Sequence, residues 1–122
     1  MSGRALIVDD SGLARRIVRQ ILEQRDVAVI EAEDGMSALE KYTLERPDVV
    51  ILDLVMRGMY GQDVLIKLRA LDPNARVIVV TADIQTPARE SAQAAGALAF
   101  VNKPVNAAEL LDAVDAALGS PR

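Results

Sequence analysis

The sequence predicts an α/β protein built on one doubly wound sheet of five parallel strands, each followed by a helix. Five short runs rich in β-branched residues alternate with longer segments of helical periodicity along the whole chain. Four of the five runs are almost continuously apolar, as expected for strands buried on both faces of a parallel sheet. The length of 122 residues, with 51% hydrophobic and 26% charged residues, is typical of one domain with its own core. We therefore expect a single domain over 1–122, with 120–122 as a loose tail.

The second of the five expected strands has the pattern of a sheet edge. The second passes into an alternation of apolar residues with Glu31 and Glu33, which is typical of an edge strand. Repeated strand–helix units favour right-handed crossovers between parallel strands. The five expected strands are 5–8, 27–30, 49–52, 77–80 and 97–101.

The segments between the strands have the spacing of amphipathic helices. The expected helices are about 11–25, 35–46, 61–72, 86–95 and 106–118. One face of the first helix carries four apolar residues, Leu13, Ile17, Ile21 and Leu22.

Residues at the ends of these segments predict where the helices begin and end. Ser11 and Asn106 have side-chain oxygens suited to an N-cap, and Gly96 and Gly119 are suited to the C-terminal end.

Composition excludes several classes of function. The chain has no cysteine and no histidine, which removes thiol catalysis, Cys- or His-ligated metals, disulfides and His-based catalytic triads. It shows no signal peptide and no apolar run of transmembrane length, so we expect a cytoplasmic protein with no membrane partner. The formal net charge of −4 disfavours nucleic acid as a direct partner.

Polar side chains follow four of the expected strands. Asp9 and Asp10 follow the first strand, and Asp53 follows the third. Thr81 follows the fourth, and Lys103 comes soon after the fifth. In open α/β sheets the functional site lies at the carboxyl ends of the strands. If the strands take the flavodoxin-like order 2-1-3-4-5, all five side chains meet at one end.

This combination indicates phosphoryl transfer onto an aspartate. Clustered carboxylates need a cation to offset their repulsion, and oxygen ligands without His or Cys suit Mg²⁺. A carboxylate beside the metal is a possible nucleophile, with Thr81 and Lys103 placed to contact phosphoryl oxygens. Taken singly, Asp10 is more often a turn former or helix cap, Thr81 an ordinary strand-end residue and Lys103 a solvated lysine. Only their conjunction is informative.

The chain resembles the receiver domains of two-component response regulators, over essentially its whole length. The resemblance is carried by Leu6-Ile7-Val8-Asp9-Asp10-Ser11, Glu31-Ala32-Glu33-Asp34-Gly35, Asp48-Val49-Val50-Ile51-Leu52-Asp53-Leu54, Thr81-Ala82-Asp83, Ala95-Gly96-Ala97 and Lys103-Pro104. It implies a flavodoxin-like (βα)5 fold with strand order 2-1-3-4-5. It also implies that the chain is a phosphoacceptor rather than an enzyme.

The resemblance implies a role for each residue of the site. Asp53 would be phosphorylated by a sensor histidine kinase or histidine phosphotransfer protein, and Mg²⁺ would be the cofactor. The metal ligands would be Asp9, Asp10, Asp53 and the backbone carbonyl of Val55.

Other residues would respond to the phosphoryl group. Thr81 and Lys103 would contact it, and the Lys103–Pro104 bond should be cis. Thr81 and Phe100 would then switch the face formed by the fourth helix, fifth strand and fifth helix, which would control a downstream protein. Plain core filling is the alternative role for Phe100.

The loop after Asp53 departs from the family pattern. Arg57 stands where the family usually has Pro, and Tyr60 where it usually has Asp, although Gly58 and Gly61 remain. Both changes put the geometry of 54–61 in doubt. Arg57 is either a solvated residue or one that reaches the phosphoryl group or a partner.

Val55 and Asp83 lie two residues beyond Asp53 and Thr81, and would flank the position of an attacking water. Because an apolar side chain cannot orient water, we expect slow self-dephosphorylation.

The chain stops after its fifth expected helix, so we expect a stand-alone receiver of the chemotaxis or phosphorelay type. A receiver cut from a longer regulator with a separate output domain is the alternative. The basic residues Arg15, Arg16 and Arg19 either help to dock the kinase or form a solvated helix face.

Other classes fit the sequence less well. A haloacid-dehalogenase phosphatase needs Asp-x-Asp after the first strand, an FMN carrier needs a Ser/Thr-rich phosphate loop and aromatics, and a P-loop needs its glycines. Asp9-Asp10-Ser11 is not Asp-x-Asp, that loop has one serine, aromatic residues make up 2% of the chain, and no P-loop is present. A receiver-like interaction module that is not phosphorylated is the remaining rival.

Overall fold

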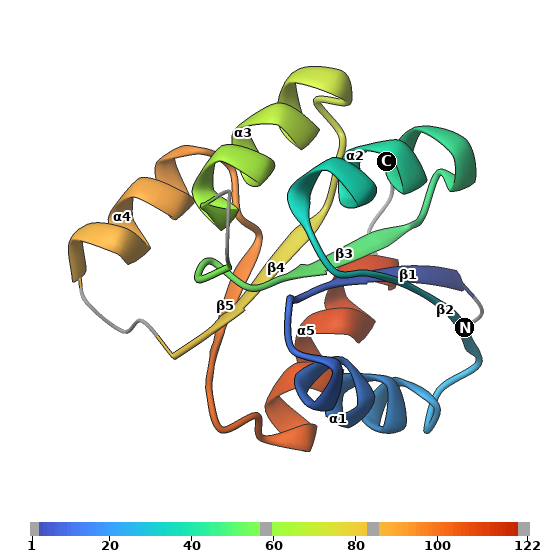
Figure 1. Cartoon of the computed structure of the whole chain (residues 1–122). Coiled ribbons are helices and arrows are strands. Elements are labelled where there is room, and N and C mark those ends of the chain that lie inside the picture. Colours follow the sequence, from blue (N-terminus) through green and yellow to red (C-terminus); the bar gives the residue numbers. More distant parts are fainter. Residues whose placement is uncertain (1–2, 57–59, 83–85, 120–122) are drawn as a thin grey trace.

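The computed structural model describes residues 3–56, 60–82 and 86–119, which form a five-stranded parallel sheet in the order β2-β1-β3-β4-β5 (Figure 1). Strand and helix alternate throughout, which confirms the predicted fold class and strand order. The strands are β1 (Gly3–Val8), β2 (Val27–Ala32), β3 (Val49–Leu52), β4 (Val77–Thr81) and β5 (Ala99–Asn102). The helices are α1 (Gly12–Leu22), α2 (Gly35–Glu45), α3 (Gly61–Leu71), α4 (Thr86–Ala94) and α5 (Ala107–Gly119).

The helices cover both faces of the sheet. Helices α1 and α5 pack on one face, and α2, α3 and α4 pack on the other (Figure 1). Successive strand residues alternate between two hydrophobic clusters, because side chains of a strand point to opposite faces in turn. The cluster under α2–α4 includes Leu6, Val8, Val50, Leu52, Val77 and Val79. The cluster under α1 and α5 includes Ala5, Ile7, Val49, Ile51, Ile78 and Val80.

Strand register determines which residues reach the site end of the sheet together. Val8 of β1 is paired with Leu52 of β3, so the residues that follow them, Asp9 and Asp53, emerge side by side. Thr81 is paired with Asn102, so Lys103 follows directly beyond Thr81. The carboxyl ends of four adjacent strands therefore deliver the polar residues to one place.

The four predicted helix boundaries are confirmed. The Ser11 hydroxyl accepts a hydrogen bond from the Ala14 N–H at 3.1 Å, and the Asn106 side chain accepts one from the Glu109 N–H at 3.0 Å. Gly96 follows α4 with a φ of 101°, a conformation that favours glycine. Gly119 is the last residue of α5, at the predicted C-terminal end.

Two sequence-based expectations about burial are corrected. Leu13 and Ile17 are 67% and 43% exposed, because the core-facing stripe of α1 runs through Val18, Ile21 and Leu22 instead. Strand β5 is half-buried rather than buried on both faces, because it is the second edge of the sheet and has a neighbour on one side only. Strand β2 forms the other edge, as predicted.

Within the described ranges, none of the helices has the length and apolar character needed to cross a membrane.

The C-terminus of α2 contains a strained residue. Arg46 caps this helix in the left-handed conformation, with φ 48° and ψ 59°, and its N–H donates to the Tyr42 carbonyl at 3.0 Å. A residue with a Cβ atom in this conformation costs about 1–2 kcal/mol. Glycine is the usual residue at this position of a helix.

We expect Arg46→Gly to raise the free energy of unfolding by up to about 1 kcal/mol, because relief of the Cβ strain exceeds the extra entropy of the unfolded chain. Chemical denaturation measures this change. Arg46→Ala keeps the Cβ atom and should give no gain. A glycine variant less stable than the alanine variant would contradict the prediction.

Candidate functional site

Four polar residues gather at the carboxyl ends of β1, β3, β4 and β5. Asp9, Asp53 and Thr81 are buried, with exposed fractions of 5%, 7% and 3%. The backbone continues the sheet as far as the two acids, because the Asp53 N–H donates to the Val8 carbonyl at 3.0 Å. These side chains are therefore positioned by the sheet itself.

Lys103 joins the two buried carboxylates. Its Nζ donates to Asp9 Oδ2 at 2.8 Å and to Asp53 Oδ2 at 3.0 Å. Its backbone N–H donates to the Thr81 carbonyl at 3.0 Å, which ties the β5–α5 connection to the end of β4. The bond between Lys103 and Pro104 is cis, as the resemblance implied.

Burial and charge act against each other in this cluster. Burial is the main cause that raises the pKa of Asp53, and hydrogen bonds from the Val55 N–H and Lys103 only partly offset it. For Lys103 burial is again the largest single influence, and it lowers the pKa. The hydrogen bonds and negative charges of Asp9 and Asp53 together outweigh burial, so the pKa of Lys103 is raised overall. The lysine therefore stays charged, whereas burial works against the charge on Asp53.

The remaining carboxylate oxygens are held by backbone N–H groups. Asp9 Oδ1 accepts from the Ser11 N–H at 2.9 Å, and Asp53 Oδ1 accepts from the Val55 N–H at 3.1 Å. Ser11 also caps α1, so the turn after β1 is fixed both by the helix and by the acid. Each buried acid thus has one oxygen held by the backbone and one shared with Lys103.

The predicted convergence of three carboxylates is only partly realised. Asp10 lies in the same turn as Asp9, but its side chain is exposed because the backbone alternates direction at the strand end. Among the residues with described positions, no three acidic side chains form a group that could hold a metal ion. Asp9 and Asp53 still bring two negative charges against the single charge of Lys103. Such a set of hard oxygen donors fits Mg²⁺, which proteins usually bind through only one or two carboxylates.

The start of α3 packs directly against the backbone of Asp53. The Gly61 N–H donates to the Leu54 carbonyl at 2.9 Å, and a Cβ atom on Gly61 would lie 2.2 Å from the Asp53 carbonyl oxygen. Only glycine allows this approach. Tyr60 precedes it with an exposed side chain that does not cap the helix. The predicted roles of Arg57, Gly58 and Asp83 fall on residues outside the described ranges.

Phe100 lies on β5, three residues before Lys103. Its half-buried ring packs against the cluster under α2–α4, and the Arg89 guanidinium of α4 lies 5.2 Å from the ring centroid. This distance is typical of a cation–π contact. The sequence did not predict the contact with Arg89, because nothing local relates a residue of α4 to β5.

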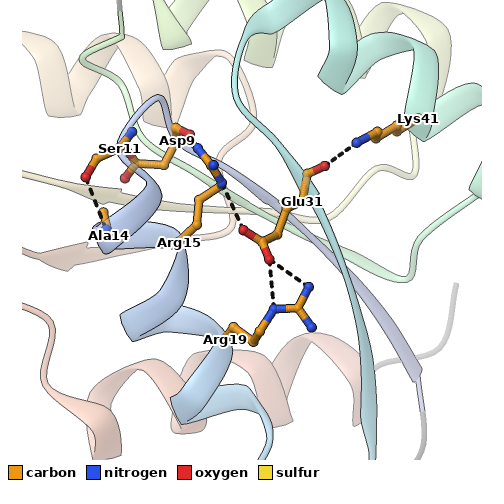
Figure 2. Close-up of polar contacts among 7 residues, drawn as sticks. All are labelled: Asp9, Ser11, Ala14, Arg15, Arg19, Glu31 and Lys41. Atoms are coloured by element: carbon orange, nitrogen blue, oxygen red, sulfur yellow. Dashed lines mark hydrogen bonds and ion pairs between the residues drawn. The ribbon is translucent and has the colours of Figure 1, made fainter.

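Sequence reasoning also missed a polar network on the α1 side. Arg15 and Arg19 both bind the carboxylate of Glu31, and Arg15 also donates to the Asp9 backbone carbonyl (Figure 2). The two arginines that were expected on a docking or solvated face are therefore paired within the domain. Their spacing of four residues, which places them on one side of a helix, was the available signal.

Comparison with known proteins agrees with this geometry. The family described as "Response regulator receiver domain" matches residues 5–115. The chain is 37% identical to chemotaxis protein CheY of Listeria monocytogenes, over 93% of this chain and 97% of that protein. It is 34% identical to sporulation initiation phosphotransferase F of Bacillus subtilis, over 93% and 92%. The crystal structure of a CheY-like response regulator receiver domain protein from Methanospirillum hungatei superposes with a TM-score of 0.91 at 30% identity, over 98% and 95%.

Because burial raises the pKa of Asp53, its charge destabilises the folded state above that raised pKa. We expect Asp53→Asn to raise the free energy of unfolding at pH 7 by about 1 kcal/mol, since the amide oxygen can still accept from the Val55 N–H. The gain should shrink as the pH falls through the raised pKa toward the ordinary value of 3.8, because the parent carboxyl then becomes neutral in the fold.

Denaturant unfolding from pH 7 to pH 3.5 measures this difference. Asp112→Asn, at an exposed position of α5, is the matched control and should change stability by less than about 0.5 kcal/mol. An Asp53→Asn variant less stable than the parent at pH 7 would show that the pairing with Lys103 outweighs burial.

Proposed function

The chain belongs to the family of response regulator receiver domains, and on this basis we propose that it accepts a phosphoryl group on Asp53 and thereby switches a partner-binding face. One observation carries the proposal: Asp53 is buried at the end of β3 and shares the Lys103 ammonium with Asp9. A buried carboxylate at a strand end, a fixed orientation and a countercharge within hydrogen-bonding distance suit such an acceptor.

The transfer joins an Asp53 carboxylate oxygen to phosphorus. The bond from phosphorus to the donor group breaks, and its electron pair leaves with the donor, an imidazole for a phosphohistidine. Lys103 already lies 3.0 Å from Asp53 Oδ2, so its ammonium is placed to contact an oxygen of the added group. The phosphoryl group would come from a sensor histidine kinase or a histidine phosphotransfer protein.

Receiver domains generally bind Mg²⁺ at the phosphorylation site, and the donor set of this site fits that ion. Asp9, Asp10, Asp53 and the Val55 carbonyl would hold it. When bound, Mg²⁺ offsets negative charge on the carboxylates and on the transferred group. The two negative charges of Asp9 and Asp53 against the single ammonium of Lys103 support this assignment.

Switching would pass from the site toward β5. Thr81 is buried beside the acids, and its carbonyl accepts the Lys103 N–H. A displacement of Thr81 or Lys103 toward the phosphoryl group would thus pull on the end of β5 and on Phe100. Because β5 is a half-buried edge strand flanked by α4 and α5, this face is less constrained than the centre of the sheet.

We further propose that the domain spans the whole chain of 122 residues and acts in chemotaxis-type or phosphorelay signalling through a downstream protein target. Similarity to CheY and to sporulation initiation phosphotransferase F along most of their lengths supports this class of role.

Incubation with Mg²⁺ and acetyl phosphate should add one phosphoryl group to the parent chain and none to Asp53→Asn. Intact-mass spectrometry measures the addition. Asp112→Asn, which removes a carboxylate far along α5, should be modified like the parent.

A parent chain that gains no mass and whose amide spectrum does not respond to beryllofluoride would contradict the proposal. The interaction-module function would then take its place. Modification of Asp53→Asn to the same extent would show that another residue is the acceptor.

Val55 bears on the lifetime of the phosphorylated form. Its side chain is 58% exposed next to the acceptor and carries no group that can orient a water molecule. We expect slow self-dephosphorylation of the parent chain. In Val55→Asn the rate of self-dephosphorylation should increase about three- to tenfold, which is a small share of the acceleration that a positioned proton acceptor contributes. Loss of the phosphoryl group followed by mass spectrometry gives the rate. Val55→Ala should remain slow, and fast hydrolysis of the parent protein would refute the prediction.

A further inference from the structure

The turn that carries Asp9 and Asp10 is held from the β2 side by an arginine that a glutamate anchors. Arg15 Nη1 donates to the Asp9 carbonyl oxygen at 2.6 Å, and its Nε donates to Glu31 Oε1 at 2.9 Å (Figure 2). Arg19, one turn further along α1, binds the other oxygen of Glu31, with its Nε at 2.8 Å and its Nη2 at 2.7 Å. Arg15 is mostly buried, with 17% of its side chain exposed.

The bonded carbonyl belongs to the peptide that links the two acids. Because a peptide is planar, rotating the Asp9 carbonyl would also redirect the backbone that places Asp10. The Asp9 N–H is already fixed by the Ala32 carbonyl at 3.2 Å, and its Oδ1 by the Ser11 N–H. Arg15 supplies the contact on the carbonyl itself.

Glu31 makes this contact specific to arginine. The guanidinium is planar, so holding Nε on the Glu31 carboxylate also sets the direction of Nη1. Partial burial is the largest single influence on the pKa of Glu31 and raises it. The hydrogen bonds that Glu31 accepts from Arg19 and from Arg15, together with the charges of both arginines, outweigh burial and lower the pKa. Glu31 therefore stays ionised at neutral pH.

We propose that Arg15, anchored by Glu31, is a positioning residue that orients the Asp9–Asp10 peptide for Mg²⁺ binding. This inference rests on the proposed function, since it assigns these two acids to the metal. The contact lies outside the acid cluster and touches none of the reacting groups. Its effect is exerted through the Asp9 backbone.

The direction in which Mg²⁺ affinity changes when Arg15 is replaced distinguishes a positioning role from an effect of its charge. Arg15 is a cation close to the acids, so charge alone predicts that removing it tightens Mg²⁺ binding. Positioning predicts the opposite. Arg19 is the matched control, because it binds the same Glu31 from the same helix but has no bond to Asp9.

The experiment measures the Mg²⁺ dissociation constant of Arg15→Gln, Arg15→Lys and Arg19→Gln beside the parent, with Mg²⁺ alone as ligand. Binding is followed by the amide NMR signals of the site, since the chain has no tryptophan to report it. Circular dichroism establishes that each variant is folded. We expect Arg15→Gln to bind Mg²⁺ about tenfold more weakly and Arg19→Gln to remain within about twofold of the parent.

Affinity in Arg15→Gln equal to or tighter than in the parent would overturn the inference, as would an equal loss in Arg19→Gln. If Arg15→Gln does not fold, Arg15→Lys carries the test: it keeps the positive charge but loses the planar fork, so binding should weaken, and unchanged affinity overturns the proposal. A parent chain that binds no Mg²⁺ but is folded would instead refute the proposed function, and the inference with it. The parent and variant results therefore separate the two failures.

Discussion

The shared ammonium of Lys103 allows two carboxylates to be buried side by side at the end of the sheet. Without a countercharge, Asp9 and Asp53 would repel each other in a site where water can offset little of the repulsion. The same lysine is tied by its backbone to Thr81, so one residue connects the ends of β1, β3, β4 and β5. The electrostatic balance of this site therefore depends on the Lys103 side chain, while the Lys103 backbone joins the ends of β4 and β5.

The sheet supplies the rigidity that this balance needs. Register places Asp9 beside Asp53, and the two apolar clusters hold β1, β3 and β4 from both faces. Gly61 brings the start of α3 onto the Asp53 backbone, where a larger residue would not fit. In contrast, β5 is half-buried at the edge. The domain thus combines a fixed acceptor with a neighbouring strand that is less constrained, which suits a site whose chemical state is read at the surface.

The α1 side of the site is organised by charge pairs within the domain. Arg15 and Arg19 are both bound to Glu31, although the sequence suggested a basic docking or solvated face. The exposed apolar residues of α1, Leu13 and Ile17, lie on the surface instead of in the core. Polar groups of this helix therefore face the sheet edge, and part of its apolar surface faces solvent.

By itself the sequence determined the alternation of strands and helices, the strand order through family resemblance, and the strand-end positions of Asp9, Asp53, Thr81 and Lys103. These features follow from local periodicity and from where each apolar run stops. Tertiary structure alone decided that Lys103 bridges two acids, that Asp10 turns outward, that Arg89 lies over Phe100 and that Arg15 reaches the Asp9 carbonyl. Each of these depends on register, helix rotation or side-chain direction, which are set when distant segments pack and which leave no periodic trace in the chain.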